Sequence, residues 1–165
     1  MFARWTEVML LRGIDGSEFE VTIEGPGPTT KVYGAGGDQY WVEVRARVST
    51  PTQGWTFSGE ILDNLEVGIL ADWLQTISGS RYAAQKLDFA EPDFSFRVLD
   101  SSEDYIALRI YFERRGRPGG LDYLGEDWGS FWVDLQVLRA DLRAEASALR
   151  ADASRLPPGD SLKGL

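Results

Sequence analysis

The sequence contains no histidine and no cysteine, and this absence limits the chemistry open to the protein. Histidine is the usual general base near neutral pH, so Ser-His-Asp triads, Cys-His dyads and histidine-ligated metals are excluded. Without cysteine there are no disulfides, no thiol nucleophiles and no thiolate zinc sites. An enzyme with this composition would depend on carboxylates, lysine, tyrosine or serine. We expect no enzymatic activity and no cofactor.

Carboxylates are the main catalytic candidates that remain. Glu91, Glu113 and Asp134 could supply the pair of a glycosidase, whose two carboxyl groups lie roughly 5–10 Å apart. Nothing in their spacing along the chain fixes such a distance, and an acidic chain supplies such residues by chance. A carboxylate-dependent hydrolase is therefore kept as an alternative function.

Two loop motifs match known ligand sites only in part. The glycine-rich run at 34–37 lacks the Lys-Ser/Thr pair of a phosphate-binding P-loop, and a predicted strand follows it where a helix is needed. Asp122, Glu126 and Asp127 offer oxygen ligands to a hard cation, but their spacing misses the EF-hand pattern. We interpret the two motifs as a flexible loop and a solvated acidic loop, and we expect no metal site.

The chain is strongly acidic, with 26 Asp and Glu against 17 Lys and Arg and a formal net charge of −9. This charge repels nucleic acids and anionic membranes at long range and attracts basic proteins, although acidity can also serve solubility alone. No stretch approaches the roughly 18 apolar residues of a membrane span, and residues 1–7 lack the apolar core of a signal peptide. We expect a cytoplasmic protein that binds neither nucleic acid nor membrane.

Alternating apolar residues predict several half-buried strands. The strongest run covers 105–113, with every second residue from Ile106 to Phe112 facing inward. Residues 17–24 form another run, and its outer face is acidic. The remaining inward positions are Phe19, Val21, Ile23, Tyr40, Val42, Val44, Ala46, Val48, Phe94, Phe96, Val98, Phe131, Val133, Leu135 and Val137.

Two helices are predicted, over 64–78 in the centre of the chain and over 139–155 near its end. The central helix begins with Asp63 and Glu66 at capping-box spacing, and Leu65, Ile69, Trp73 and Ile77 recur at helical intervals. The second helix carries a stripe of Leu138, Leu142, Ala146, Leu149 and Ala153, and prolines end it.

These elements predict an α+β fold in which about seven strands form a mostly antiparallel curved sheet or sandwich, with both helices packed on it. We expect a single domain over 1–165. Its ends, 1–7 and 158–165, are expected to be flexible, and 25–39 and 114–130 are expected to be long loops.

The order of these signals over roughly residues 40–158 resembles the WapI-type immunity proteins of bacterial toxin systems. The residues that carry the resemblance are Trp55, the helix with Leu65, Trp73-Leu74 and Ile77, the segment Leu87-Asp88-Phe89-Ala90-Glu91-Pro92, Phe94-Ser95-Phe96, Phe112-Glu113, a tryptophan-bearing acidic loop and the final helix. The resemblance implies a small cytoplasmic protein that neutralises a toxin domain, often a nuclease.

Charge and loop position, rather than the family, suggest where such a toxin would bind. Large aromatic residues among charged ones are typical anchors of protein interfaces, and Tyr123, Trp128 and Trp132 lie in or beside the second loop, where both an interface role and a structural role are open to them. The predicted contact residues are Glu113, Asp122, Glu126 and Asp127 for charge pairing, with Tyr123 and Trp128 as anchors. A carbohydrate- or ligand-binding β domain that uses the same aromatic residues is the other alternative.

Overall fold

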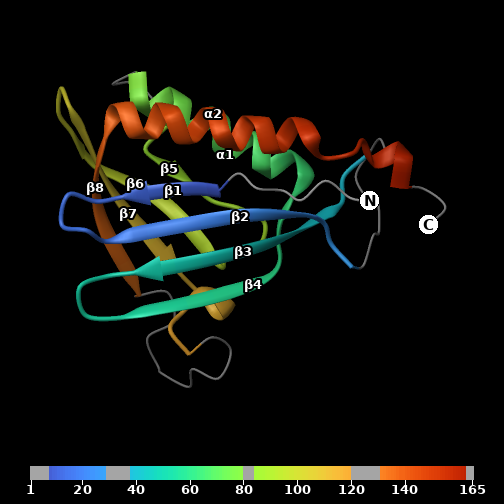
Figure 1. Ribbon diagram of the computed structural model, residues 1–165, viewed down its shortest axis with the longest axis horizontal. Helices are drawn as coiled ribbons and strands as arrows, with labels where there is room; N and C mark the ends of the chain where they lie inside the picture. The colour runs from blue at the N-terminus through green and yellow to red at the C-terminus, as the bar shows by residue number, and fades with distance from the viewer. Residues whose placement is uncertain (1–7, 29–37, 80–83, 120–130, 163–165) are drawn as a thin grey trace.

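Two antiparallel sheets face each other in the computed structural model, which describes residues 8–28, 38–79, 84–119 and 131–162 (Figure 1). Each sheet has four strands, and the strands follow one another in chain order. This arrangement confirms the predicted α+β class and, of the two forms considered, matches the sandwich. The first sheet contains β1 (Val8–Arg12), β2 (Glu18–Pro26), β3 (Trp41–Ser49) and β4 (Gly54–Asp63). The second contains β5 (Lys86–Leu87), β6 (Phe94–Ser101), β7 (Tyr105–Phe112) and β8 (Trp132–Leu138).

The core between the sheets is rich in aromatic rings. Phe19 of the first sheet contacts three rings of the second edge to face, with centroids 5.3 Å from Phe94, 6.0 Å from Phe96 and 5.6 Å from Phe112. Such edge-to-face pairs add to the energy of burial because ring edges and faces carry opposite partial charge. The inward positions predicted in β2, β3 and β7 are all buried, since strand alternation sends every second side chain to one face.

Both helices lie side by side along one flank of the sandwich (Figure 1). They are α1 (Asn64–Gly79) and α2 (Arg139–Arg155), so the structure confirms both predicted helices to within one residue. Leu142, Ala146 and Leu149 of α2 are buried as predicted, whereas Leu138 precedes the helix and is exposed. Within the described ranges, no helix is long and apolar enough to span a membrane.

The start of α1 shows the predicted capping box. Asp63 Oδ1 accepts the backbone N–H groups of Leu65 and Glu66, each at 2.8 Å. Glu66 makes the reciprocal hydrogen bond of the capping box, because its Oε2 accepts the Asp63 N–H at 3.0 Å. Its other oxygen, Oε1, accepts the N–H of Ala90 at 2.8 Å and so joins the helix to the segment before β6. The first backbone N–H groups of a helix have no partner within the helix, and these carboxylate oxygens accept their hydrogen bonds.

The buried face of α1 differs from the predicted stripe. Leu65 and Ile69 are about half exposed, at 46% and 49%, while Val67, Leu70 and Leu74 are buried. The sequence showed a helical repeat of apolar residues that extends almost around the helix. Because α1 packs against both α2 and the sheets, tertiary contacts decide which part of that repeat is covered.

The segment after β7 was predicted to start a long loop, but its described part, 114–119, packs onto the sandwich. Arg114–Gly116 forms a 3-10 turn, η1. The guanidinium of Arg115 makes a two-pronged ion pair with Asp93, which is fully buried, at 3.1 and 3.0 Å. Trp55 Nε1 donates to the Gly116 carbonyl at 2.8 Å. This turn therefore fastens β4 of the first sheet to the start of β6 in the second.

Two other boundaries differ from the sequence expectations. Gly25 and Pro26, placed at the start of the first long loop, belong to β2 and pair with Glu43 and Val42. Gly159–Leu162, expected in a flexible end, forms a 3-10 turn, η3. A Cβ on Gly159 would lie 2.4 Å from the Asp38 carbonyl oxygen, so only glycine permits this close approach.

The pKa of Glu66 provides a pH test of the capping box. Burial raises the pKa of this carboxyl above its ordinary value of 4.5 in the folded state. An acid with a raised folded pKa contributes stability that is complete below its unfolded pKa and is lost as the pH rises through its folded pKa. We therefore compare the wild type with Glu66→Gln, whose side chain does not titrate. The difference between their free energies of unfolding, wild type minus variant, should fall as the pH rises from about 4.5 and then level off. Urea unfolding across this pH series measures it, and a difference that grew with pH would contradict the burial argument.

Candidate functional site

The outer face of the second sheet carries arginine and aromatic side chains on three neighbouring strands. Strand pairing places Arg109 opposite Asp134 and Tyr111 opposite Trp132. The guanidinium of Arg109 binds both carboxylate oxygens of Asp134, at 2.8 and 3.1 Å, and lies 4.7 Å from the centre of the Trp132 ring. The hydrogen bonds with Asp134 raise the pKa of Arg109. Trp132, 43% exposed, is thus presented to solvent in a held orientation.

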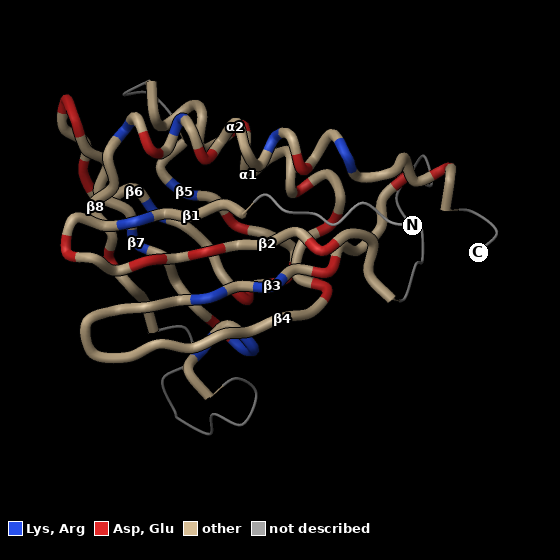
Figure 2. The backbone as a smooth tube through the Cα atoms, viewed as in Figure 1, with Lys and Arg blue, Asp and Glu red and all other residues tan. Residues whose placement is uncertain are grey.

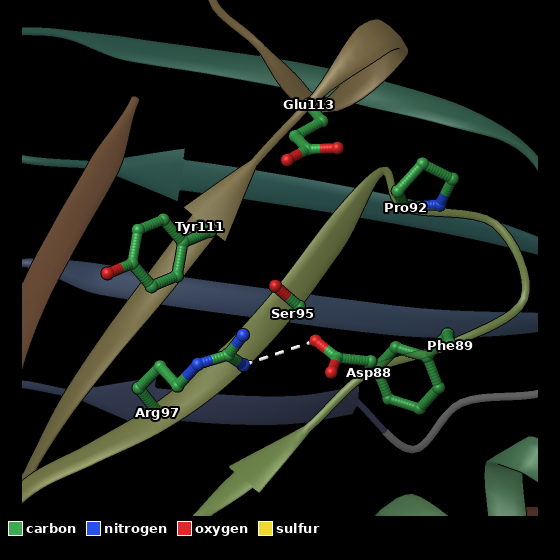
Figure 3. Close-up of a pocket in the computed structure, with 7 residues that line it drawn as sticks. All are labelled: Asp88, Phe89, Pro92, Ser95, Arg97, Tyr111 and Glu113. Atoms are coloured by element: carbon green, nitrogen blue, oxygen red, sulfur yellow. Dashed lines mark hydrogen bonds and ion pairs between the residues drawn. The ribbon is translucent and has the colours of Figure 1, made fainter. Parts of the chain in front are cut away.

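A hollow of about 360 Å³ adjoins this row of side chains (Figure 3). Arg97 stands at its side, bound to Asp88 at 3.1 Å and 5.6 Å from the centre of the Tyr111 ring. The lining combines apolar walls with hydroxyl, guanidinium and carboxylate groups, which suits a polar or charged side chain of a partner. Its lining residues are Asp88, Phe89, Pro92, Ser95, Arg97, Tyr111 and Glu113.

Glu113 is the described member of the predicted contact set, and it lines this hollow. It follows β7 directly, and its backbone N–H donates to the Asp93 carbonyl at 3.1 Å. Its half-buried carboxylate extends toward the hollow (Figure 3), and no described residue forms a hydrogen bond or ion pair with it. Glu113 therefore offers a negative charge whose position is set by the Arg115–Asp93 turn beside it.

The other five predicted contact residues lie outside the described residues. They are Asp122, Tyr123, Glu126, Asp127 and Trp128. Their predicted role in partner binding stays a prediction. The described residues that flank this segment are Gly119 and Phe131, and Phe131 directly precedes Trp132 in β8.

Arg97, Arg109 and Tyr111 are surface residues that the sequence reasoning did not single out. A signal was present, because they alternate with buried residues in β6 and β7 and must point outward. The sequence did not indicate that both described helices, α1 and α2, lie away from this face. Trp132 was named as a candidate for either an interface or a structural role; it is 43% exposed, and a role in an interface stays a prediction.

The outer face of the first sheet has a different character. Glu18 and Glu20 of β2 both bind Arg47 of β3, at 3.0 and 2.7 Å, and Glu24 binds Arg45 at 2.7 Å. The hydrogen bond from Arg47 lowers the pKa of Glu18, as expected for a carboxylate in an ion pair. Acidic and basic residues therefore alternate across β2 and β3 (Figure 2). The predicted acidic outer face of β2 exists, but arginine neutralises much of it.

The arrangement of the described acidic side chains bears on metal binding. No group of three or more Asp and Glu side chains in the described ranges is placed to hold a metal ion.

Strand pairing separates the two carboxylates Glu113 and Asp134. Asp134 lies opposite Arg109, and Glu113 follows Arg109 by four residues along the chain. At the rise of an extended strand this places the backbones of Glu113 and Asp134 about 13 Å apart along the strand direction. That spacing disfavours the Glu113–Asp134 pair as the two carboxylates of a glycosidase.

A family model described as the immunity protein WapI-like family matches residues 9–157. The matched region includes both sheets and both helices. No curated protein and no solved structure matches the chain significantly.

Proposed function

The chain belongs to the WapI-like immunity protein family, and we propose that it protects a bacterial cell by binding one cognate toxin domain through the outer face of the second sheet. Family membership supports the role in toxin immunity. The choice of surface rests on one observation: an exposed tryptophan held by an arginine lies beside a hollow that is lined by Glu113, whose carboxylate pairs with no described residue. Tryptophan, tyrosine and arginine are the residues enriched at binding hot spots.

Charge supports a basic partner. The net charge of −9 accelerates association with a positively charged domain, and nuclease toxins need positive charge to hold phosphates. Glu113 would pair with a cationic side chain of the toxin, and Asp122, Glu126 and Asp127 would add to the attraction. Tyr123 and Trp128 would supply further apolar contact. Binding of this kind is stoichiometric and would take place in the cytoplasm, without turnover.

The two alternatives have less support. A carboxylate hydrolase based on Glu113 and Asp134 requires a shorter separation than their strand positions give. A carbohydrate-binding domain would use the ring face of Trp132 for stacking, but the guanidinium of Arg109 already lies over that ring. Inhibition of a basic toxin also predicts slower association at high ionic strength, whereas stacking on sugar is largely insensitive to salt.

Co-expression tests the proposal. We expect the toxin to be the C-terminal domain of a large secreted protein whose gene lies next to the gene of this chain. We expect cells that express this domain to survive only when the immunity protein is present, and we expect the two purified proteins to form a one-to-one complex. Survival without the immunity protein, or failure to form the complex, would remove the proposed function.

A charge reversal at Glu113 tests the role of the hollow. We expect Glu113→Lys to weaken toxin binding about tenfold, because it places a positive charge against a basic partner. Glu103→Lys is the matched control, since Glu103 is exposed in the turn at the opposite end of β7 and the change in net charge is the same. Surface plasmon resonance of both variants at two salt concentrations measures the effect. Equal weakening by the two variants would show that only net charge matters.

A further inference from the structure

The outer edge of β4 offers a second surface, separate from the outer face of the second sheet. In an antiparallel ladder, paired residues alternate between those that exchange hydrogen bonds and those that do not. The hairpin fixes the phase of this alternation for β3 and β4, because the Thr50 N–H donates to the Gln53 carbonyl at 2.8 Å. The bonded pairs are therefore Val48–Trp55, Ala46–Phe57 and Val44–Gly59.

It follows that the backbone groups of Gly54, Thr56 and Ser58 point away from β3. Glu60, the next residue in this series, supports the assignment, because its carbonyl accepts a hydrogen bond from Arg115 Nη2 at 3.3 Å at the outer edge. Gly54, Thr56 and Ser58 are all exposed, and no described residue hydrogen-bonds to their outward N–H and C=O groups. Each residue offers one donor and one acceptor to an additional strand.

The other edges of the two sheets are short or covered. At β1, the carboxylate of Glu145 from α2 accepts the Leu10 N–H at 2.9 Å. At β8, the Gln136 carbonyl accepts the Ile14 N–H at 3.0 Å. The edge strand β5 contains only two residues. Exposed edges are usually blocked by such contacts, by proline, by lysine or by a bulge.

The stretch from Gly54 to Ser58 has none of these blocking features. It contains no proline and no charged residue, and the register shift between β3 and β4 lies at the other end of the ladder, near Val42. Five residues extend over about 17 Å, enough for a short strand to pair. We infer that this edge is a pairing site for an extended, positively charged segment of the toxin domain, which would add a fifth strand to the first sheet.

Charge argues for the toxin rather than a second copy of this chain as the occupant. Two copies would each bring a net charge of −9, and like charges disfavour their approach, whereas a basic segment is attracted. The inference rests on the proposed function, because the toxin is the partner. It adds a mode of contact in which backbone hydrogen bonds supply affinity, independent of the residues on the second sheet.

Amide hydrogen exchange on the wild-type protein tests the inference directly. In the free protein we expect the N–H groups of Gly54, Thr56 and Ser58 to exchange rapidly, and those of Trp55 and Phe57 to be protected by β3. In the complex with the toxin domain we expect all five to be protected. A complex that forms while the three outward amides still exchange rapidly would overturn the edge-pairing inference and leave the proposed function intact. If the three outward amides became protected without toxin, and more so at higher protein concentration, a second copy of this chain would be the occupant. That result would also overturn the inference that the edge pairs with the toxin.

A proline substitution provides the matched variant. Thr56→Pro removes an outward N–H without removing a bond to β3, a position where an edge strand tolerates proline. We expect it to weaken toxin binding by about tenfold, while Thr56→Val, which keeps the N–H, changes binding by less than about twofold. Circular dichroism and thermal unfolding establish that both variants are folded. Equal affinity of the two folded variants would refute strand pairing.

Discussion

Replacing Arg115 with alanine is expected to destabilise the protein by about 3–5 kcal/mol, the largest effect on stability that we predict. Asp93 is fully buried, and both of its carboxylate oxygens accept hydrogen bonds from Arg115. Without the guanidinium, Asp93 would remain as a buried charge with its main partner removed, and burial of an uncompensated charge is costly. Chemical denaturation of the purified variant measures the change in unfolding free energy.

Arg114 is the matched control for this prediction. It is the neighbouring arginine, but its side chain is 56% exposed and its contact with Glu91 is longer, at 3.4 Å. Exposed pairs of this kind contribute less than about 1 kcal/mol, so Arg114→Ala should leave stability almost unchanged. The double variant Asp93→Ala, Arg115→Ala should lose less stability than the sum of the two single variants, because the pair is removed together. Additive losses would show that the two residues do not depend on each other.

Replacing Trp132 with alanine is expected to weaken toxin binding at least thirtyfold, which corresponds to about 2 kcal/mol. The ring is exposed on the edge strand of the proposed surface, and Arg109 and Tyr111 hold it in one orientation before the partner arrives. A side chain that is already ordered loses little conformational entropy when it becomes buried in an interface. Isothermal titration calorimetry with the purified toxin domain measures the loss of affinity.

Two measurements separate this binding effect from a general one. The folded protein should lose at most about 1 kcal/mol of stability in Trp132→Ala, because the ring makes one cross-strand pair with Tyr111 and one contact with the Arg109 cation among the described residues. Ile69→Ala removes a side chain of similar exposure, at 49%, that lies on α1. It should bind the toxin like the wild type. If Trp132→Ala bound as tightly as Ile69→Ala, the outer face of the second sheet would not be the toxin-binding surface.

Local sequence patterns predicted much of the fold because local physics determines those features. The alternation of Ile106, Leu108 and Ile110 identified β7 and its buried face, since a strand sends every second side chain to the same side. Asp63 and Glu66 identified the start of α1, because a capping box involves residues only three positions apart. Both sets of contacts form between near neighbours in the chain or depend on the period of one element.

The candidate site was predicted less completely because it joins residues that are distant in the sequence. Glu113 was proposed from its charge and its position before a loop, and it does line the hollow on the second sheet. Arg97 and Tyr111 meet there only because β6 pairs with β7, and Arg109 meets Trp132 only because β7 pairs with β8. Nothing in the separate strand patterns specifies these pairings.

The sequence by itself determined the classes of chemistry that are excluded, the net charge, the strand and helix segments, and the resemblance to the immunity family. These follow from residue types and short-range periodicity. Only the tertiary structure decided that arginine neutralises the acidic face of β2, that Arg115 is an internal ion-pair partner of Asp93, and that no described residue hydrogen-bonds to the outer edge of β4 over 54–58. Each of these depends on which distant segments come together, because electrostatic and hydrogen-bonding partners are set by proximity in space rather than by order along the chain.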